Sequence, residues 1–119
     1  MTLVECYAAL EGDYESVLGR MRSEKLVRKF VSKFLLDPSF ENLKQALAEG
    51  KQEEAFRAAH TLKGMCLNLG FTRLGNSSEA LTEAVRHAIT PEAEGLLAIV
   101  AADYEMTAVA IRTLEASEG

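Results

Sequence analysis

Apolar residues recur at spacings of three and four along most of this chain, which is the period of an amphipathic helix. No stretch alternates apolar and polar residues over enough positions to predict a strand. The pattern predicts helices at about residues 2–11, 14–21, 24–36, 40–49, 52–69, 73–88 and 91–115. In the last of these, the apolar stripe consists of Leu96, Leu97, Val100, Tyr104, Thr107, Ala108 and Ile111.

Proline, glycine and capping residues mark several of the predicted helix ends. Ser39 is expected to cap the helix that follows Pro38, and Gly50 to close it. Thr90 and Pro91 are expected to begin the last helix. Because the connections between the longer helices are short, successive helices should pack as antiparallel neighbours. We therefore expect an all-α fold, an antiparallel (up-down-up-down) four-helix bundle with additional short N-terminal helices in about residues 1–36.

Composition narrows the class of protein further. A chain of 119 residues with 48% hydrophobic content fits a single domain, residues 1–119, with one core. No apolar run approaches the roughly 18 residues that a membrane span needs, and the N-terminus does not read as a signal peptide, so we expect a cytoplasmic protein. The net charge of −5 argues against nucleic-acid binding, since that class carries a basic surface. Cys6 and Cys66 are predicted to be buried and reduced, with a redox role left open.

The candidate chemistry lies in the predicted helix at residues 52–69. On a helical wheel His60 falls nearly opposite the core face, and Lys63 follows one turn later on the same side. Gly64 costs about 1 kcal/mol relative to alanine in mid-helix, which indicates either tight packing or the close approach of a partner. Phe56 and Leu67 add apolar surface on this side and indicate a docking patch. The core face is predicted to consist of Ala55, Ala58, Leu62, Met65, Cys66 and Leu69.

A histidine in this setting suits the transfer of a phosphoryl group. Neutral imidazole, with an unperturbed pKa of about 6.5, is a competent nucleophile near neutral pH. Lys63 could offset part of the charge of the phosphoryl group. The alternative is an exposed histidine without a function. His87 is interpreted as a structural residue at a helix end, and because the two histidines are not spaced as a ligand pair, no metal site is predicted.

The segment AAHTLKGMCLNLGFTRLGNSSEAL resembles the histidine-containing phosphotransfer (HPt) domain family. The signature of this family is His-x-x-Lys-Gly, followed by small and apolar residues and a Leu-Gly helix end. The matching residues are His60, Lys63, Gly64, Leu69 and Gly70. The preceding DPSFENLKQALAEGKQEEAFRAAH also resembles the family's usual lead-in to the active helix.

The resemblance implies a role for each site residue. His60 is the phospho-acceptor, at Nε2, Lys63 stabilises the phosphoryl group, and Gly64 gives steric access to the partner. Some family members also use a polar residue and an arginine on the following helix, and these positions are Thr82 and Arg86 here. Phe56, Leu67 and Thr82 are expected to contact the partner.

The resemblance also implies a carrier and not an enzyme. His60 would receive a phosphoryl group from the aspartate of one response-regulator receiver domain, or of a hybrid histidine kinase, and pass it to another receiver. No cofactor of its own is expected, with Mg²⁺ bound by the partner receiver, and a monomer is expected. The chain has no glycine motif of the kind with which kinases bind nucleotides. Two alternatives stay open: a non-phosphorylated adaptor that binds receivers or other helical partners, and a phospho-acceptor domain like that of a chemotaxis kinase.

Overall fold

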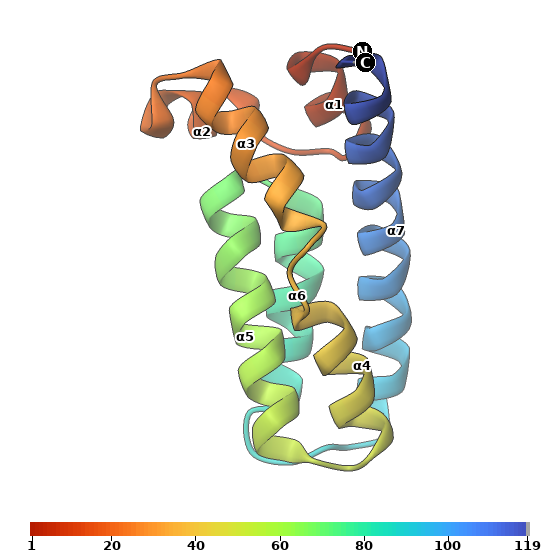
Figure 1. Cartoon of the computed structure of the whole chain (residues 1–119). Helices are drawn as coiled ribbons and strands as arrows, with labels where there is room; N and C mark the ends of the chain where they lie inside the picture. The colour runs from red at the N-terminus through yellow and green to blue at the C-terminus, as the bar shows by residue number, and fades with distance from the viewer. Residues whose placement is uncertain (119) are drawn as a thin grey trace.

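The regular secondary structure of this protein consists of α-helices. The computed structural model describes residues 1–118, and no strand occurs among them. The helices are α1 (Leu3–Ala9), α2 (Tyr14–Met21), α3 (Glu24–Phe34), α4 (Ser39–Ala48), α5 (Gln52–Leu69), α6 (Thr72–Ala84) and α7 (Glu92–Glu118). Helices α4 to α7 pack in chain order and alternate in direction, whereas α1, α2 and α3 gather at one end of the bundle (Figure 1). The predicted all-α fold is confirmed.

Most helix bounds differ from the prediction by a few residues, and hydrogen bonds explain the difference at α4 and α6. Ser39 is the first residue of α4 and not its cap, because the Asp37 carboxylate accepts a hydrogen bond from the Ser39 N–H at 2.7 Å. Helix α6 ends at Ala84 and not near residue 88. The Gln52 side-chain amide donates to the carbonyls of Val85 and Arg86, at 2.7 and 2.9 Å, and so satisfies backbone groups that a longer helix would have bonded internally. The prediction for Gly50 is confirmed, since it has a φ of +69° directly after α4.

Aromatic side chains join the N-terminal helices to the bundle. Phe34 of α3 meets Phe71 edge to face at 5.1 Å between ring centroids, and Phe71 also contacts Tyr7 of α1. Phe40 of α4 stacks on Tyr104 of α7 at 4.2 Å. Such pairs stabilise a fold beyond the area that they bury.

The thiols of both cysteines lie in the hydrophobic core. Cys6 and Cys66 are free and buried, as predicted. Burial raises the pKa of Cys6 to about 11, and it raises that of Cys66 as well. A raised pKa keeps a thiol protonated and unreactive at neutral pH.

The C-terminal end of α5 is fixed by the N-terminal helices. The Tyr7 hydroxyl donates to the Leu69 carbonyl at 2.6 Å, and the Arg20 guanidinium donates to the carbonyls of Leu67 and Asn68. Gly70 then turns the chain at a φ of +72°, and its own carbonyl accepts from the N–H of Asp13 at 2.7 Å. These bonds satisfy carbonyls that the end of a helix leaves without partners, so α1 and α2 set the position of α5.

Removing one of these bonds should loosen the end of α5. We expect Tyr7→Phe to lower the free energy of unfolding by about 1–2 kcal/mol, because the buried Leu69 carbonyl loses its donor while the packing of the ring is kept. Urea titration followed by circular dichroism would measure the change. Tyr14→Phe, at an exposed hydroxyl that donates to Glu24, is the matched control and should be nearly neutral. Equal losses in the two variants would contradict the role given to Tyr7.

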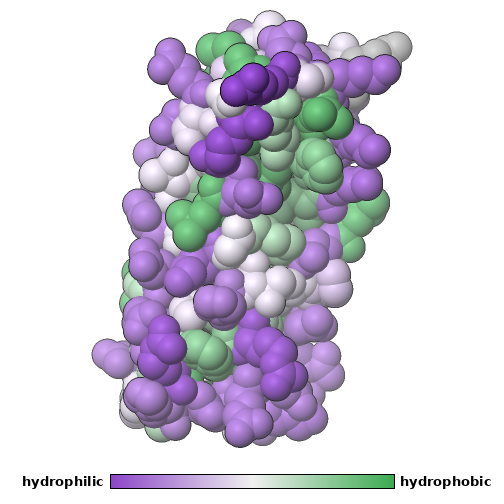
Figure 2. Space-filling model, turned by 90° about the vertical axis from the view of Figure 1, so that its left-hand side faces the viewer, coloured by the Kyte–Doolittle hydropathy of each residue, from purple (hydrophilic) through white to green (hydrophobic). Residues whose placement is uncertain are grey.

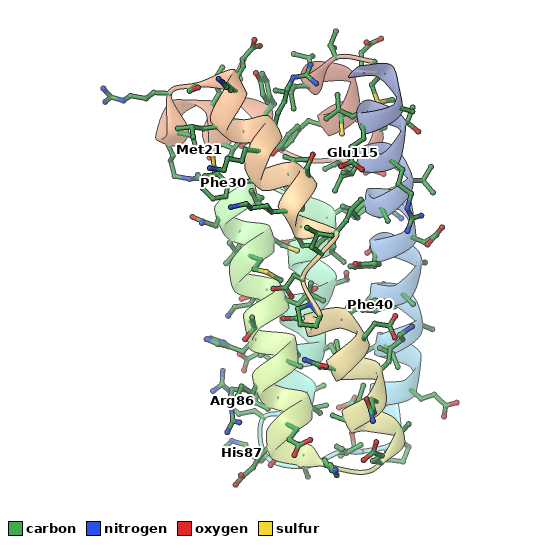
Figure 3. All side chains as sticks on the ribbon, viewed as in Figure 1. Met21, Phe30, Phe40, Arg86, His87 and Glu115 are labelled. Carbon is green, nitrogen blue, oxygen red and sulfur yellow. The ribbon has the colours of Figure 1, made fainter. Side chains whose placement is uncertain are left out.

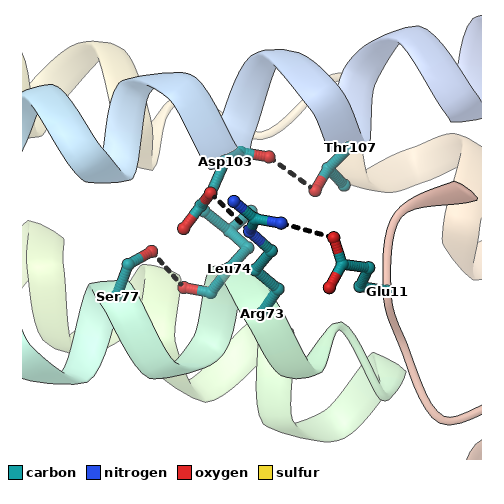
Figure 4. Close-up of polar contacts among 6 residues, drawn as sticks. All are labelled: Glu11, Arg73, Leu74, Ser77, Asp103 and Thr107. Carbon is teal, nitrogen blue, oxygen red and sulfur yellow. Dashed lines mark hydrogen bonds and ion pairs between the residues drawn. The ribbon is translucent and has the colours of Figure 1, made fainter.

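An ion-pair network fixes α6 against α7 (Figure 4). Arg73 of α6 donates from Nε to the carboxylate of Asp103 in α7 at 2.9 Å, and it pairs through Nη1 with Glu11 after α1. The Asp103 side chain is buried, so its charge needs this partner. The network therefore holds three segments that are distant in sequence in one arrangement.

None of the helices described here combines the length and the apolar character that crossing a bilayer requires.

Candidate functional site

His60 lies near the middle of α5 and is exposed. The adjacent residue Ala59 and the nearby Leu62 are buried, so the core anchors the helix directly beneath the imidazole. The predicted outward direction of His60 is confirmed. Met65 lies at the edge of the predicted core face: it packs against the core but is only half-buried, and it lines a surface groove beside Phe30 of α3.

The Phe56 ring contacts both the His60 imidazole and the Arg86 guanidinium. The Phe56 ring stacks on the His60 ring, with 5.9 Å between centroids and 19° between planes. On Phe56 in turn lies the Arg86 guanidinium, 5.0 Å from the ring centroid. Arg86 follows the end of α6 and lies beside the lower half of α5, next to the exposed His87 (Figure 3). A cation over an aromatic face is attracted by the electron density of the ring.

Arg86 is held in this place by a carboxylate that the sequence did not single out. Glu83 accepts two hydrogen bonds from the Arg86 guanidinium, at 2.7 and 3.1 Å. These bonds lower the pKa of the Glu83 carboxyl, and the charges of Arg86, Lys63 and His60 lower it further. Glu83 is therefore part of the electrostatic surroundings of His60. Its spacing of three residues from Arg86 was the available sequence signal.

Lys63 and Gly64 occupy the turn of α5 that follows His60. Lys63 is half-buried, which limits the freedom of its stem, and Gly64 is exposed. A Cβ built on Gly64 would meet no atom within 4 Å. Tight packing therefore does not explain this glycine.

The prediction for Thr82 is wrong. Its side chain is fully buried, and its hydroxyl donates to the carbonyl of Ser78 at 2.7 Å. Helix α6 packs against both α5 and α7, so two of its sides are buried and not one. Thr82 lies on a buried side and therefore cannot contact a partner. Gly75, two helical turns before Thr82, is buried as well.

The two apolar members of the predicted docking patch are accessible. Leu67 has 57% of its surface exposed, and Phe56 is half-buried against the core. They lie on the same helix as His60, on either side of it in the sequence.

The sequence analysis missed an apolar groove between α3 and α5. It has a volume of about 290 Å³ and is lined by Met21, Phe30, Lys33, Phe34, Asp37, Met65, Asn68 and Leu69. Figure 3 shows Met21 and Phe30 together near the upper part of α5. In Figure 2, which presents this side of the molecule, hydrophobic side chains gather in the upper half and polar ones dominate below. The available sequence signal was Phe30, an apolar residue of the predicted helix at residues 24–36, which is 41% exposed in the structure.

Within the described part of the chain, no group of three or more His, Cys, Asp or Glu side chains is arranged to hold a metal ion. The candidate site combines an accessible imidazole, two nearby cations and an exposed glycine on α5.

The comparison with protein families agrees with this geometry. The model of the Hpt domain matches residues 35–114, which include α4 to α6 and most of α7. The chain therefore belongs to the Hpt domain family, whose members are phosphocarrier modules of two-component signalling and not enzymes. No curated protein and no solved structure matches the chain.

Proposed function

We propose that this protein is a carrier in a phosphorelay, which accepts a phosphoryl group on His60 from the aspartate of one receiver domain and passes it to another. The observation that carries the proposal is the geometry of α5: an exposed imidazole, a lysine one turn on, and a glycine at which a side chain would meet nothing. We further propose that the relay operates in the cytoplasm.

The proposed transfer is a displacement at phosphorus. The lone pair of His60 Nε2 forms a P–N bond as the bond between phosphorus and the aspartyl oxygen of the receiver breaks. The electrons of the broken bond stay on the aspartate, which leaves as a carboxylate. The proton on Nδ1 stays on the ring, so no further base is required. Transfer to the next receiver reverses these changes, and Mg²⁺ on the receiver offsets charge on the phosphoryl oxygens.

Two cations of this chain support the step. Lys63 is on the same face as His60, one turn away, where an ammonium can approach the phosphoryl oxygens. Arg86 is one aromatic ring away from the imidazole, and a guanidinium binds phosphoryl oxygens well. Both act by charge on a group that carries close to two negative charges.

The apolar groove between α3 and α5 supports a receiver as the partner. It lies along the same helix as His60, and Leu67 adds accessible apolar surface on the His60 side of that helix. Two basic residues lie at the groove: Lys33 lines it, and Arg20 donates to the carbonyl of Asn68, another lining residue. We propose that the receiver places an apolar helix with acidic flanks in this groove, which would align its aspartate with His60.

Phosphorylation by a receiver tests the proposed function. Purified protein is incubated with a labelled phospho-receiver and Mg²⁺, and transfer of label is followed on a gel. We expect label on this chain that survives base and is lost in acid, as a P–N bond requires. Binding of the receiver without transfer of label would instead support the adaptor, and label obtained only from an ATP-binding kinase domain would support the chemotaxis-type acceptor.

Lys63 should affect the chemistry and not the fold. We expect Lys63→Ala to slow transfer from a receiver, because the variant loses an ammonium that stabilises charge on the phosphoryl oxygens. The expected factor is only about tenfold, since Lys63 is half-exposed and water screens its charge. Rapid-quench measurement of single-turnover transfer would give the rate. Lys63→Arg keeps the positive charge and should therefore retain most of the wild-type transfer rate. A Lys63→Ala protein with the wild-type rate, or a marked fall in melting temperature, would contradict this assignment.

A further inference from the structure

The Glu83–Arg86 ion pair lies close to the proposed phospho-acceptor His60, and the Glu83 carboxylate has no role in the transfer step described above. Arg86 donates from Nε to one oxygen of Glu83 at 3.1 Å and from Nη2 to the other at 2.7 Å. The same guanidinium lies 5.0 Å from the Phe56 ring centroid, and that ring stacks on His60. Glu83 thus occupies the hydrogen-bonding edge of a cation that is one ring away from the imidazole.

Phosphorylation of His60 would change the balance of charge in this cluster. The carboxylate of Glu83 already experiences the charges of Lys63 and His60, after the hydrogen bonds from Arg86 that dominate its lowered pKa. A phosphoryl group on His60 brings close to two negative charges to the same place. The phosphoryl group would therefore repel the Glu83 carboxylate and attract the Arg86 guanidinium. Both anions, the phosphoryl group and Glu83, would then compete for Arg86.

We propose that Glu83 competes with the phosphoryl group of His60 for Arg86 and thereby keeps the phosphohistidine a ready donor. While Glu83 holds Arg86, the phosphoryl group is stabilised by fewer cations and moves on more readily to an aspartate. No bond to Glu83 forms or breaks, and only the hydrogen-bonding partner of Arg86 changes. Glu83 is a positioning residue that acts through Arg86, and this inference rests on the proposed function.

The exposure of the pair limits the size of the effect. The side chains of Arg86 and Glu83 have 42% and 54% of their surface exposed, so water and salt screen the interaction. We expect Glu83→Gln to shift the equilibrium of the phosphoryl group between a receiver and His60 toward His60 by about threefold to tenfold at low ionic strength. The shift should shrink at high salt. Glutamine has nearly the same size, so the fold should be unaffected.

The experiment compares four proteins of full length. Wild type, Glu83→Gln, Glu83→Gln/Arg86→Gln and Glu115→Gln are each phosphorylated with phosphoramidate, and ³¹P NMR gives the lifetime of the phosphohistidine. Each is then mixed with one receiver domain and Mg²⁺, and the distribution of label at equilibrium is measured. Glu115 is an exposed acid at the other end of the bundle (Figure 3), so its replacement controls for the loss of one negative charge.

The expected result has three parts. Glu83→Gln lengthens the phosphohistidine lifetime and shifts the equilibrium toward His60, the double variant loses this gain, and Glu115→Gln behaves as wild type. A Glu83→Gln protein with the wild-type distribution, or a double variant that keeps the gain, would overturn the role of Glu83 while the proposed function stands. A wild-type chain that takes label from neither phosphoramidate nor a receiver would overturn the proposed function itself.

Discussion

Replacing His60 with glutamine is expected to abolish phosphorylation of this chain and to leave its fold intact. Glutamine has no lone pair comparable to that of imidazole, so no P–N bond can form. The His60 side chain is exposed and its main packing partner is the Phe56 ring, so the free energy of unfolding should change by no more than about 0.5 kcal/mol. Label transfer from a phospho-receiver and thermal unfolding would measure the two effects.

The second histidine provides the matched control. His87 is also exposed and lies in the same region of the molecule, near Arg86 (Figure 3). His87→Gln should therefore be labelled as wild type is. Label that persists in His60→Gln and disappears in His87→Gln would show that the acceptor was wrongly assigned.

Enlarging Gly64 is expected to separate docking from chemistry. We expect Gly64→Gln to reduce transfer from a receiver at least about 100-fold, because a side chain at this position prevents the aspartate from approaching within bonding distance. Phosphorylation by phosphoramidate, a small donor that needs no docking, should continue at a rate near that of wild type. Parallel time courses with the two donors would measure the difference. Equal rates of transfer from the receiver in wild type and variant would contradict the assigned role of Gly64.

We expect that glycine at position 64 lowers the stability of the fold relative to alanine. Because a Cβ on Gly64 meets no atom within 4 Å, Gly64→Ala should raise the free energy of unfolding by about 0.5–1 kcal/mol. Gly95 is the matched control, since it is helical, exposed and equally free of neighbours. Gly95→Ala should bring a comparable gain in stability without impairing transfer, whereas Gly64→Ala should impair it.

Local features of the sequence were sufficient to predict the fold class and the exposed position of the proposed phospho-acceptor, His60. Helical periodicity predicted seven helices, with α2 and α5 at the bounds that the structure gives. The same periodicity placed His60, Lys63 and Gly64 on one exposed face, because residues three and four apart in a helix lie on one side of it. A single helix determines all three positions, so no knowledge of its neighbours was required.

Features that depend on contacts between helices were decided by the tertiary structure. Whether Thr82 reaches the surface depends on how wide an arc α5 and α7 cover on α6, and the wheel of one helix does not contain that information. The end of α6 depends on Gln52, which is distant in sequence and donates to the carbonyls of Val85 and Arg86 directly after the helix.

The sequence by itself thus determined which residues can carry the chemistry, and the tertiary structure decided what surrounds them. The contacts of Phe56 with His60 and Arg86, and of Arg86 with Glu83, bring together α5 and the end of α6. The groove beside α5 likewise needs α3 to pack against it. The physical reason is that helix periodicity fixes directions within one element, whereas burial, capping and ion pairing depend on which elements pack together.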